Sequence, residues 1–185
     1  MQLKQKQLHP QAGITLVEMM VVVAIIAVMA FFAGPEMLQF GPKARLKSAT
    51  QTLKSNLELA RLEAVKRNTL VTARFTTSGC DTFPPVTPSS YSITWDDNGT
   101  PQNIPLMGSS SSSTSSGNTY TFPDGTALCG SDRDIIFTSR GYLKSTTIAD
   151  EVLSLKSLEK DPGDPWYQIT VSLGGAISID RKEYK

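Results

Sequence analysis

The longest apolar stretch of the chain lies near its start, between Gly13 and Gly34. From Met19 to Ala33 it contains no charged residue and no proline. An α-helix rises 1.5 Å per residue, so about twenty apolar residues cross a bilayer core of roughly 30 Å. The pattern therefore predicts a membrane-spanning helix over residues 14–34, preceded by a polar, weakly basic segment over residues 1–13.

A second helical pattern follows two soft points, Gly34-Pro35 and Gly41-Pro42, where we expect the helix to kink or loosen. From Lys43 onward the apolar residues recur at spacings of three and four, which places them on one face of a helix. Asn68 is a suitable residue for the helix end. We predict an amphipathic helix over residues 35–68, with an apolar face made of Leu46, Ala49, Leu53, Leu57, Ala60 and Ala64.

Beyond Asn68 the chain is rich in β-branched residues, glycine, proline and serine, and its apolar runs are short. Such runs, separated by turn dipeptides, are typical of antiparallel sheets, and the apolar face of the helix needs a sheet to cover it. The predicted strands are Leu70–Thr76, Tyr91–Asp96, Tyr120–Phe122, Ile135–Thr138, Val152–Leu155, Trp166–Leu173 and Ala176–Asp180. The predicted turns are Asn98-Gly99, Asp124-Gly125, Arg140-Gly141, Pro162-Gly163 and Gly174-Gly175.

Residues 108–117 read GSSSSSTSSG, a low-complexity segment too polar to bury apolar surface. We interpret it as a loop tip, and an adaptable partner-binding loop is the alternative. The predicted fold class is α+β, in which the second half of a long N-terminal helix packs on an antiparallel sheet. The β-rich head covers residues 69–185.

One acid, Glu18, interrupts the apolar run close to its start. A carboxylate costs about 2.5 to 3.5 kcal/mol at the centre of a bilayer, so it needs either the interface or a partner. If the chain is cut between Gly13 and Ile14, Glu18 lies about one turn into the new helix. There it favours the positive end of the helix dipole and can pair with a terminal amine. A carboxylate that snorkels into the lipid headgroups is the alternative.

The same residues resemble a known family. A short basic leader that ends in glycine, a Thr-Leu-Val-Glu run at residues 15–18 and a long apolar helix are similar to the N-terminus of type IV pilins and type II secretion pseudopilins. The resemblance implies that a prepilin peptidase cuts after Gly13 and N-methylates Ile14, where the family usually has phenylalanine. It also implies that Glu18 serves filament assembly. A Sec signal peptide cut near Ala30 is the rival, which the acid inside the apolar core disfavours.

The run Leu57–Asn68, LELARLEAVKRN, resembles the L-x-x-A-R-x-E-A-x-x-R-N segment of H-type pseudopilins and FimT/FimU-type minor pilins. An ordinary amphipathic helix with salt-bridged flanks explains the periodicity of this run but not the whole string. The resemblance implies a pilin-like fold. It also implies four partners: prepilin peptidase, other pilins or pseudopilins, an inner-membrane assembly platform and membrane lipid.

Charge and composition exclude several classes of function. The 18 basic and 17 acidic residues nearly cancel, which argues against a protein built mainly to hold nucleic acid. The single histidine, His9, lies in the predicted leader, so the processed chain would have none. That excludes Ser-His-Asp and Cys-His catalysis and histidine metal sites. We predict no enzymatic activity, no catalytic residue and no cofactor.

The two cysteines, Cys80 and Cys129, both lie after the apolar run. In an exported domain they favour a disulfide, which stabilises by about 4 kcal/mol on the loop-entropy model. Two buried free thiols are the alternative. Either state is structural, because a catalytic cysteine would lack its histidine.

Two weaker patterns concern ligands. The oxygen-rich run Asp96–Gly99 fits no complete calcium motif, so a hairpin turn is favoured and no metal site is predicted. Arg181, Lys182 and Lys185 form a small basic tail. Some FimT-like minor pilins bind DNA during uptake, but so few charges give only weak, salt-sensitive contact.

Together these patterns predict a minor subunit of a type II secretion filament that supports protein secretion. A single span would hold it in the bacterial inner membrane, with a cytoplasmic N-terminus and a periplasmic head, before it joins the filament. A FimT/FimU-like minor pilin of a type IV pilus, acting in pilus assembly or DNA uptake, shares every motif named above. An exported, membrane-anchored binding or enzymatic domain is the alternative of another class.

Overall fold

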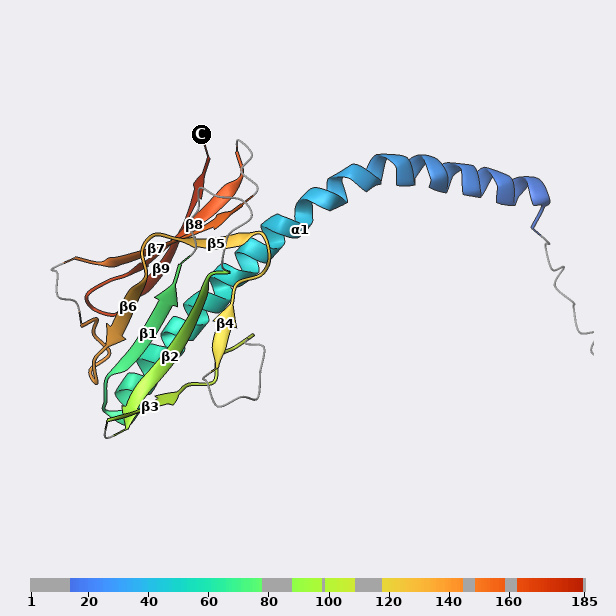
Figure 1. Cartoon of the computed structure of the whole chain (residues 1–185). Coiled ribbons are helices and arrows are strands. Elements are labelled where there is room, and N and C mark those ends of the chain that lie inside the picture. The colour runs from blue at the N-terminus through green and yellow to red at the C-terminus, as the bar shows by residue number, and fades with distance from the viewer. Residues whose placement is uncertain are drawn as a thin grey trace, which may run out of the picture. The chain divides into compact units, whose positions relative to one another are not determined.

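The computed structural model describes residues 14–77, 88–97, 99–108, 118–144, 149–158 and 163–184, and for residues 31–40 it describes the backbone only. Within these residues the chain forms one long helix, α1 (Leu16–Arg67), followed by nine short strands (Figure 1). Contacts divide the chain into two units, Met1–Phe40 and Gly41–Lys185. The division falls inside α1.

The helix α1 is continuous where the sequence predicts two soft points. It ends neither at Gly34-Pro35 nor at Gly41-Pro42. A proline removes one backbone hydrogen bond from a helix without necessarily ending it. The second pair nevertheless coincides with the boundary between the two units.

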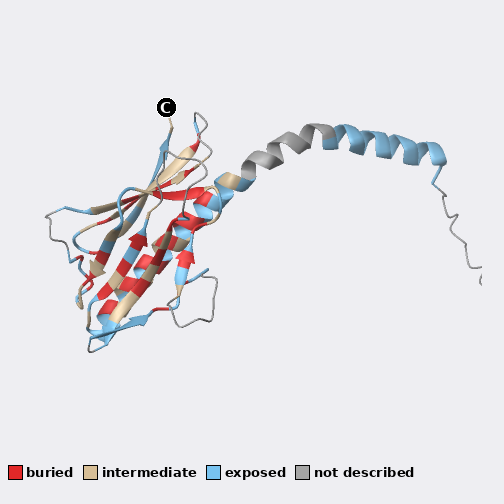
Figure 2. Ribbon diagram, viewed as in Figure 1, coloured by how far each residue is buried: buried red, intermediate tan, exposed pale blue. Residues whose placement is uncertain are grey.

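The apolar face predicted for the second half of α1 is confirmed. Each of its six residues is at most 1% exposed, and full burial of a leucine stabilises by roughly 1.5 to 3 kcal/mol. The same face also contains two buried polar residues, Thr50 and Asn56. Thr50 donates its hydroxyl to the Leu46 carbonyl one turn back, at 2.7 Å. The face is continuous from Leu46 to Ala64 (Figure 2).

The first sheet is antiparallel and contains β1 (Val71–Thr76), β2 (Ser90–Asp97), β3 (Thr100–Asn103), β4 (Thr119–Thr121) and β6 (Arg133–Phe137). The strands β2 and β6 pair with opposite edges of β1. The other edge of β2 is shared, because β4 pairs with its first residues and β3 with its last. In β1 alternate residues, Val71, Ala73 and Phe75, are buried.

The second sheet is also antiparallel, in the order β5-β7-β8-β9. Its strands are β5 (Thr126–Cys129), β7 (Glu151–Ser157), β8 (Pro165–Val171) and β9 (Ile177–Glu183). Leu155 and Ile169 from this sheet join the same hydrophobic cluster as Leu57 from α1 and Phe75 from β1. One core therefore holds the helix and both sheets together, and the α+β architecture is confirmed.

All the predicted strands are present, with ends shifted by a few residues, but the sequence does not predict β3 or β5. The strand β3 contains a proline and no other apolar residue, and all four of its residues are exposed. It is held by its pairing with β2 through a tight turn, in which Asp96 Oδ1 accepts the N–H of Gly99 at 2.7 Å. The predicted hairpin at Asp96–Gly99 is thereby confirmed.

The glycines of the predicted turns adopt the backbone conformation that the turns require. Gly99, Gly125, Gly141, Gly163 and Gly175 have φ between 76° and 88°. An L side chain rarely adopts this conformation, whereas glycine does so without a steric penalty.

Polar contacts fasten α1 to the strands near the start of the second unit. Lys43 Nζ lies 2.9 Å from Asp164 Oδ1, just before β8. Asp164 is 9% exposed, and its backbone carbonyl accepts the N–H of Tyr184 at the chain's end. The start of this half of the helix therefore contacts Asp164, just before β8, and Asp164 in turn bonds to Tyr184, just after β9.

In the middle of α1, Asn56 binds the backbone of Met107, which lies just before the serine-rich segment. Asn56 is fully buried, and its side chain accepts the N–H of Met107 at 3.0 Å and donates to the Met107 carbonyl at 3.2 Å. It also donates to the hydroxyl oxygen of Tyr91 at 2.7 Å. Residues 109–117 lie outside the described residues, so the predicted loop tip stays a prediction.

Tyr91 makes the stability of the head sensitive to alkali. Its ring lies 5.0 to 5.6 Å from those of Phe75, Tyr120 and Phe122, and burial raises the pKa of its hydroxyl. The folded state therefore keeps Tyr91 neutral when the unfolded chain ionises. We expect stability to be full below about pH 10 and to fall above it by up to about 1.4 kcal/mol per pH unit for this group.

Urea unfolding of the detergent-solubilised protein between pH 8 and 11 measures this loss. Tyr91→Phe should flatten the alkaline slope, and Tyr142→Phe should leave it unchanged because Tyr142 is 53% exposed. Equal slopes for Tyr91→Phe and the native protein would contradict the prediction.

Candidate assembly site

The first turn of α1 is closed by Thr15, the first residue of the Thr-Leu-Val-Glu run, in a capping role that the sequence analysis does not assign to it. Thr15 lies just before the helix, and its Oγ1 accepts the N–H of Glu18 at 3.2 Å. Its carbonyl accepts the N–H of Met19 at 3.3 Å. Thr15 is therefore the N-cap, and Glu18 occupies the third helical position. In the sequence, Thr15 and Glu18 have the Thr-x-x-Glu spacing of a capping box, and this spacing predicts Thr15 as the N-cap.

Glu18 lies where the sequence predicts, in the first turn of the helix. It is exposed, and within the part of the chain that the structure describes its carboxylate forms no ion pair. A negative charge in this turn is stabilised by about 0.3 to 1 kcal/mol through the helix dipole. The carboxylate thus lies in the first turn of the helix, and its exposed position leaves it accessible to a group outside the described chain.

The described side chains of this unit, over residues 14–30, form an unusually apolar surface. Its large side chains are each at least 44% exposed, namely Ile14, Leu16, Val17, Met19, Met20, Val21, Val22, Val23, Ile25, Ile26, Val28 and Met29. A contiguous apolar surface of this extent is typical of a site covered by lipid or by other proteins. Among the described residues, no helix is long and apolar enough to cross a membrane. The span over residues 14–34 stays a prediction.

In the structure, each characteristic residue of the run Leu57–Asn68 has a structural role. Leu57, Ala60 and Ala64 are 0% exposed and face the core. Asn68 has φ of +53°, and its N–H bonds to the Val65 carbonyl. The next N–H, of Thr69, bonds to the Ala64 carbonyl, which completes a Schellman motif. The asparagine therefore ends the helix and turns the chain into β1.

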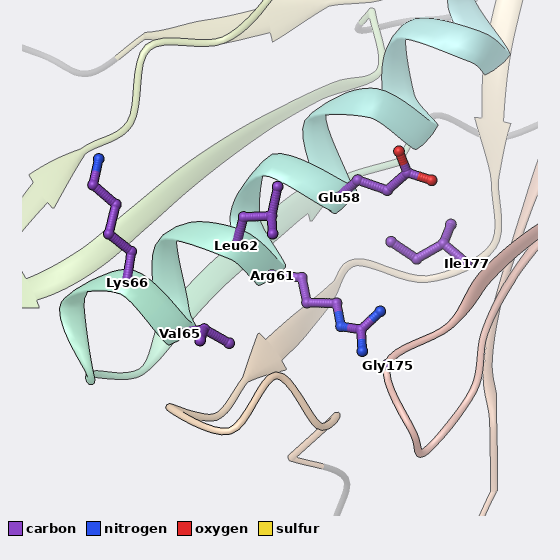
Figure 3. Close-up of a pocket in the computed structure, with 7 residues that line it drawn as sticks. All are labelled: Glu58, Arg61, Leu62, Val65, Lys66, Gly175 and Ile177. Carbon is purple, nitrogen blue, oxygen red and sulfur yellow. The ribbon is translucent and has the colours of Figure 1, made fainter.

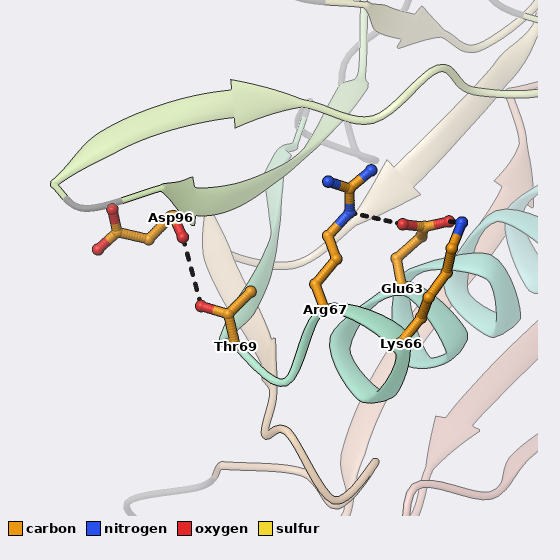
Figure 4. A network of polar contacts seen from close by, with 5 residues as sticks. All are labelled: Glu63, Lys66, Arg67, Thr69 and Asp96. Atoms are coloured by element: carbon orange, nitrogen blue, oxygen red, sulfur yellow. Dashed lines mark hydrogen bonds and ion pairs between the residues drawn. The ribbon is translucent and has the colours of Figure 1, made fainter.

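The charged residues of the run fasten the end of α1 (Figure 4). Arg67 Nε lies 2.6 Å from Glu63 Oε2, and Lys66 Nζ lies 3.2 Å from Glu63 Oε1. The hydrogen bond from Arg67 lowers the pKa of the Glu63 carboxyl, and Lys66 adds to this effect. The Arg67 guanidinium also stacks 4.1 Å from the ring centre of Trp95 in β2. The cation–π contact joins the helix end to the first sheet, and the ion pair within the helix fixes the Arg67 side chain that makes this contact.

Arg61 connects α1 to a turn from each sheet. Its Nε donates to the carbonyl of Gly141, after β6, at 3.1 Å. Its Nη2 donates to the carbonyl of Gly174, between β8 and β9, at 3.5 Å. One guanidinium thus satisfies backbone carbonyls of two turns that are far apart in sequence, a geometry that lysine does not reproduce.

A groove of about 730 Å³ lies beside this arginine, between α1 and the β8–β9 turn (Figure 3). Leu62 and Val65 are 65% and 50% exposed and form its helical wall, and Ile177 lies opposite. Figure 3 shows Arg61 reaching across towards Gly175. The groove combines apolar walls with a guanidinium already engaged in backbone contacts.

Several predicted sites are described only in part. Ile14 is 71% exposed and precedes α1, whereas Gly13 lies outside the described residues. Cys129 ends β5, but Cys80 lies outside the described residues, so the disulfide stays a prediction. Among the described residues, no group of three or more histidine, cysteine or acidic side chains is arranged to hold a metal.

The predicted basic tail is partly neutralised where it is described. Arg181 Nη2 lies 3.2 Å from Glu183 Oε1. Lys182 is exposed, and Lys185 lies outside the described residues. The described part of the tail therefore presents little net positive charge for binding a phosphate backbone.

Two protein-family models match the chain. The prokaryotic N-terminal methylation motif covers residues 8–34. The model of type II transport protein GspH covers residues 49–175. Between them the two matches extend from the predicted leader to the β8–β9 turn. A comparison with proteins of curated function finds no match.

Two solved structures of minor subunits resemble the chain. The type IV minor pilin FimU of Pseudomonas aeruginosa is 16% identical, with 79% of this chain and 97% of FimU covered and a TM-score of 0.48. The minor pseudopilin EpsH from the type 2 secretion system of Vibrio cholerae is 16% identical, with 74% and 96% covered and a TM-score of 0.49. At this identity and TM-score the likeness carries no conclusion about function.

Proposed function

We propose that this chain, which belongs to the type II transport protein GspH family, acts as a minor pseudopilin in a type II secretion filament. The observation that carries the proposal is the succession of two features in one chain. The N-terminal methylation motif over residues 8–34 precedes the GspH domain over residues 49–175. The exposed apolar surface between Ile14 and Met29 supports it, because a lone soluble domain would not keep such a surface.

The proposed sequence of events starts with a precursor in the bacterial inner membrane. A prepilin peptidase removes residues 1–13 and N-methylates Ile14. The apolar helix first lies in lipid, with the head in the periplasm, and then packs among the helices of other pseudopilins on an inner-membrane assembly platform. The subunit is structural and catalyses no reaction.

Glu18 is the residue that we assign to this transfer. Its carboxylate lies one turn from Ile14, whose amine becomes the new N-terminus after cleavage. Inside a filament, away from water, an unpaired carboxylate is costly, so a neighbour's terminal amine is its natural partner. The exposed position of Glu18 and its lack of an ion pair among the described residues are consistent with such a contact.

Gene deletion followed by quantitative mass spectrometry tests this function. The culture supernatant and the sheared surface fraction of the deletion strain are compared with those of the parent. Loss of exported enzymes with surface pilin unchanged is the expected result. Loss of pilin with secretion intact would instead make the chain a minor pilin, with DNA uptake as the next assay. If neither fraction changed, an exported anchored domain would become the better explanation.

A further inference from the structure

The strand β8 runs alongside α1 within the second unit. Just before the strand, Asp164 lies 2.9 Å from Lys43 Nζ, and just after it the carbonyl of Gly174 accepts a bond from Arg61. Lys43 to Arg61 is about 27 Å of helix, and Asp164 to Gly174 is about 33 Å of strand. The end of the unit at which α1 enters is therefore the end at which β8 begins. We call it the entry end.

A tryptophan between two lysines lies on the outer face of the second sheet near this end. In β8 the core takes Ile169 and Val171, so the alternate residue Trp166 faces outwards. Lys156 Nζ of β7 lies 5.3 Å from the centre of the Trp166 ring, and Lys182 of β9 is the register partner of Trp166 on the other side. The three side chains form a row about 7 Å along β8 from the entry end.

The first turns of α1 in this unit add cations at the same level. Arg45 and Lys47 are exposed, and Lys47 is only about 6 Å of helix from Lys43. In the part of the chain that the structure describes, Arg45, Lys47 and Lys182 form no ion pair. The entry-end surface, as we define it, consists of Lys43, Arg45, Lys47, Lys156, Trp166 and Lys182.

Acidic side chains at the entry end offset only part of this charge. Asp164 and Glu183 are each already paired with a basic side chain. Asp180 in β9 and Asp124 before β5 are exposed. The cations of the surface other than Lys43 outnumber these two acids, so among the described residues the entry-end surface keeps a net positive charge around its tryptophan.

The entry end is also the part of the second unit that follows the predicted membrane span most closely along the chain. Lys43 comes nine residues after Gly34, and α1 is continuous over them. At any angle between the two units, the two residues are therefore at most about 14 Å apart. The headgroup layer occupies roughly 5 to 8 Å on each side of the hydrocarbon core. Lys43 thus lies within about one Debye length of the headgroups at physiological salt.

We propose that the entry-end surface docks the head on anionic phospholipid headgroups while the subunit is held in the membrane. A tryptophan ring suits the membrane interface, and lysine and arginine side chains reach from it to lipid phosphates. Each basic residue near an anionic surface strengthens binding about fivefold. The inference rests on the proposed function, because docking requires a chain that is anchored in lipid. Entry into a filament then has to break these headgroup contacts.

The test uses the full chain reconstituted in vesicles, with its two tryptophans as fluorescent reporters. Trp95→Phe leaves Trp166 as the only tryptophan. Trp166→Phe leaves Trp95, which stacks on Arg67 about 36 Å of helix from Lys43. One set of vesicles is pure phosphatidylcholine, and the other has two parts phosphatidylcholine to one part phosphatidylglycerol. A small share of lipid in both carries a nitroxide quencher on its headgroup.

We expect the quencher to reduce Trp166 emission in the anionic vesicles. The effect should be small in neutral vesicles and should fade at high salt, because salt screens exposed charges. Trp95 should keep its emission in both vesicles, since it lies at the opposite end of the helix segment. Flotation of the vesicles shows separately whether the chain is anchored.

A pair of lysine substitutions locates the interaction. Lys156→Gln together with Lys182→Gln, in the Trp95→Phe chain, should lower the ratio of docked to undocked heads about twenty-five-fold, at about fivefold for each charge. Lys66→Gln together with Lys144→Gln removes two exposed lysines far from the entry end, in the last turn of α1 and next to Leu143, which bonds to Leu173. This control pair should leave the quenching of Trp166 unchanged.

The outcomes separate docking from the proposed function. Equal quenching of Trp166 in neutral and anionic vesicles would overturn the proposal, and so would an equal loss of quenching in both lysine pairs. Unquenched Trp166 in a chain that floats with the vesicles would overturn docking alone and leave the entry-end surface to an acidic protein partner. A chain that does not float would overturn the anchored function and docking together.

Discussion

Replacing Glu18 by alanine is expected to leave leader removal intact and to abolish incorporation of the subunit into filaments. The variant keeps the apolar surface and the Thr15 cap, which bonds to the backbone N–H of residue 18 and not to its side chain. It leaves a neighbour's terminal amine without a counter-charge. Removing one partner of a buried ion pair costs about 3 to 5 kcal/mol, or more than about a hundredfold in occupancy. Immunoblots of membrane and sheared filament fractions measure the loss.

Two variants show whether the charge is the cause. Glu18→Gln keeps the length and hydrogen bonding of the side chain but not its charge, and should fail as Glu18→Ala does. Glu58→Ala removes an acid from the exposed face of the same helix, where it pairs with Lys54 at 3.7 Å. An exposed pair of this kind contributes at most about 1 kcal/mol, so assembly should be normal. A fully assembled Glu18→Ala subunit would refute the role.

Replacing Gly175 by alanine is expected to destabilise the head by about 2 to 5 kcal/mol. Gly175 has φ of +77°, and a Cβ at this position would meet the Gly141 carbonyl oxygen and the Nε of Arg61. The backbone of the new alanine would therefore be strained. Its methyl group would also push apart the two turns that Arg61 joins. Urea or thermal unfolding of the purified protein measures the change.

Two other glycines serve as controls that separate backbone strain from the steric contact with Gly141. Gly163 has a similar φ of +85° but open space around it, so Gly163→Ala reports strain alone, about 1 to 2 kcal/mol. At Gly174 the nearest atom to an added Cβ is Ser172 Oγ at 3.9 Å, so Gly174→Ala should be nearly neutral. If Gly175→Ala and Gly163→Ala lower the free energy of unfolding by the same amount, the contact with Gly141 does not contribute to the destabilisation.

Periodicity and turn chemistry predict much of this fold because both are local. The apolar spacing of three and four identifies the buried face of α1 residue by residue. The turn glycines are predictable because each occupies a conformation that other residues avoid. Asn68 was predictable as a helix end for the same reason, since it adopts a φ of +53°.

What the sequence does not reveal depends on contacts between distant segments. The strand β3 exists because β2 offers it an edge, not because its own residues favour a strand. The division of the strands into two sheets is not encoded in any single run. Arg61 lies in a recognisable string, but its bonds to Gly141 and Gly174 span 80 and 113 positions. The cap at Thr15 is local by contrast, because the Thr-x-x-Glu spacing over residues 15–18 is sufficient to predict it.

The polar contacts of α1 have a mechanical consequence when force is applied to the helix. Lys43, Asn56, Arg61 and Arg67 each join the helix to a strand or to a segment next to a strand, at successive levels over about 36 Å of helix. A pull that enters the helix near Gly41 is therefore shared among several bonds loaded in parallel. Such an arrangement yields only when several contacts break together, so residues 43–67 of α1 stay attached to the strands of the second unit under load.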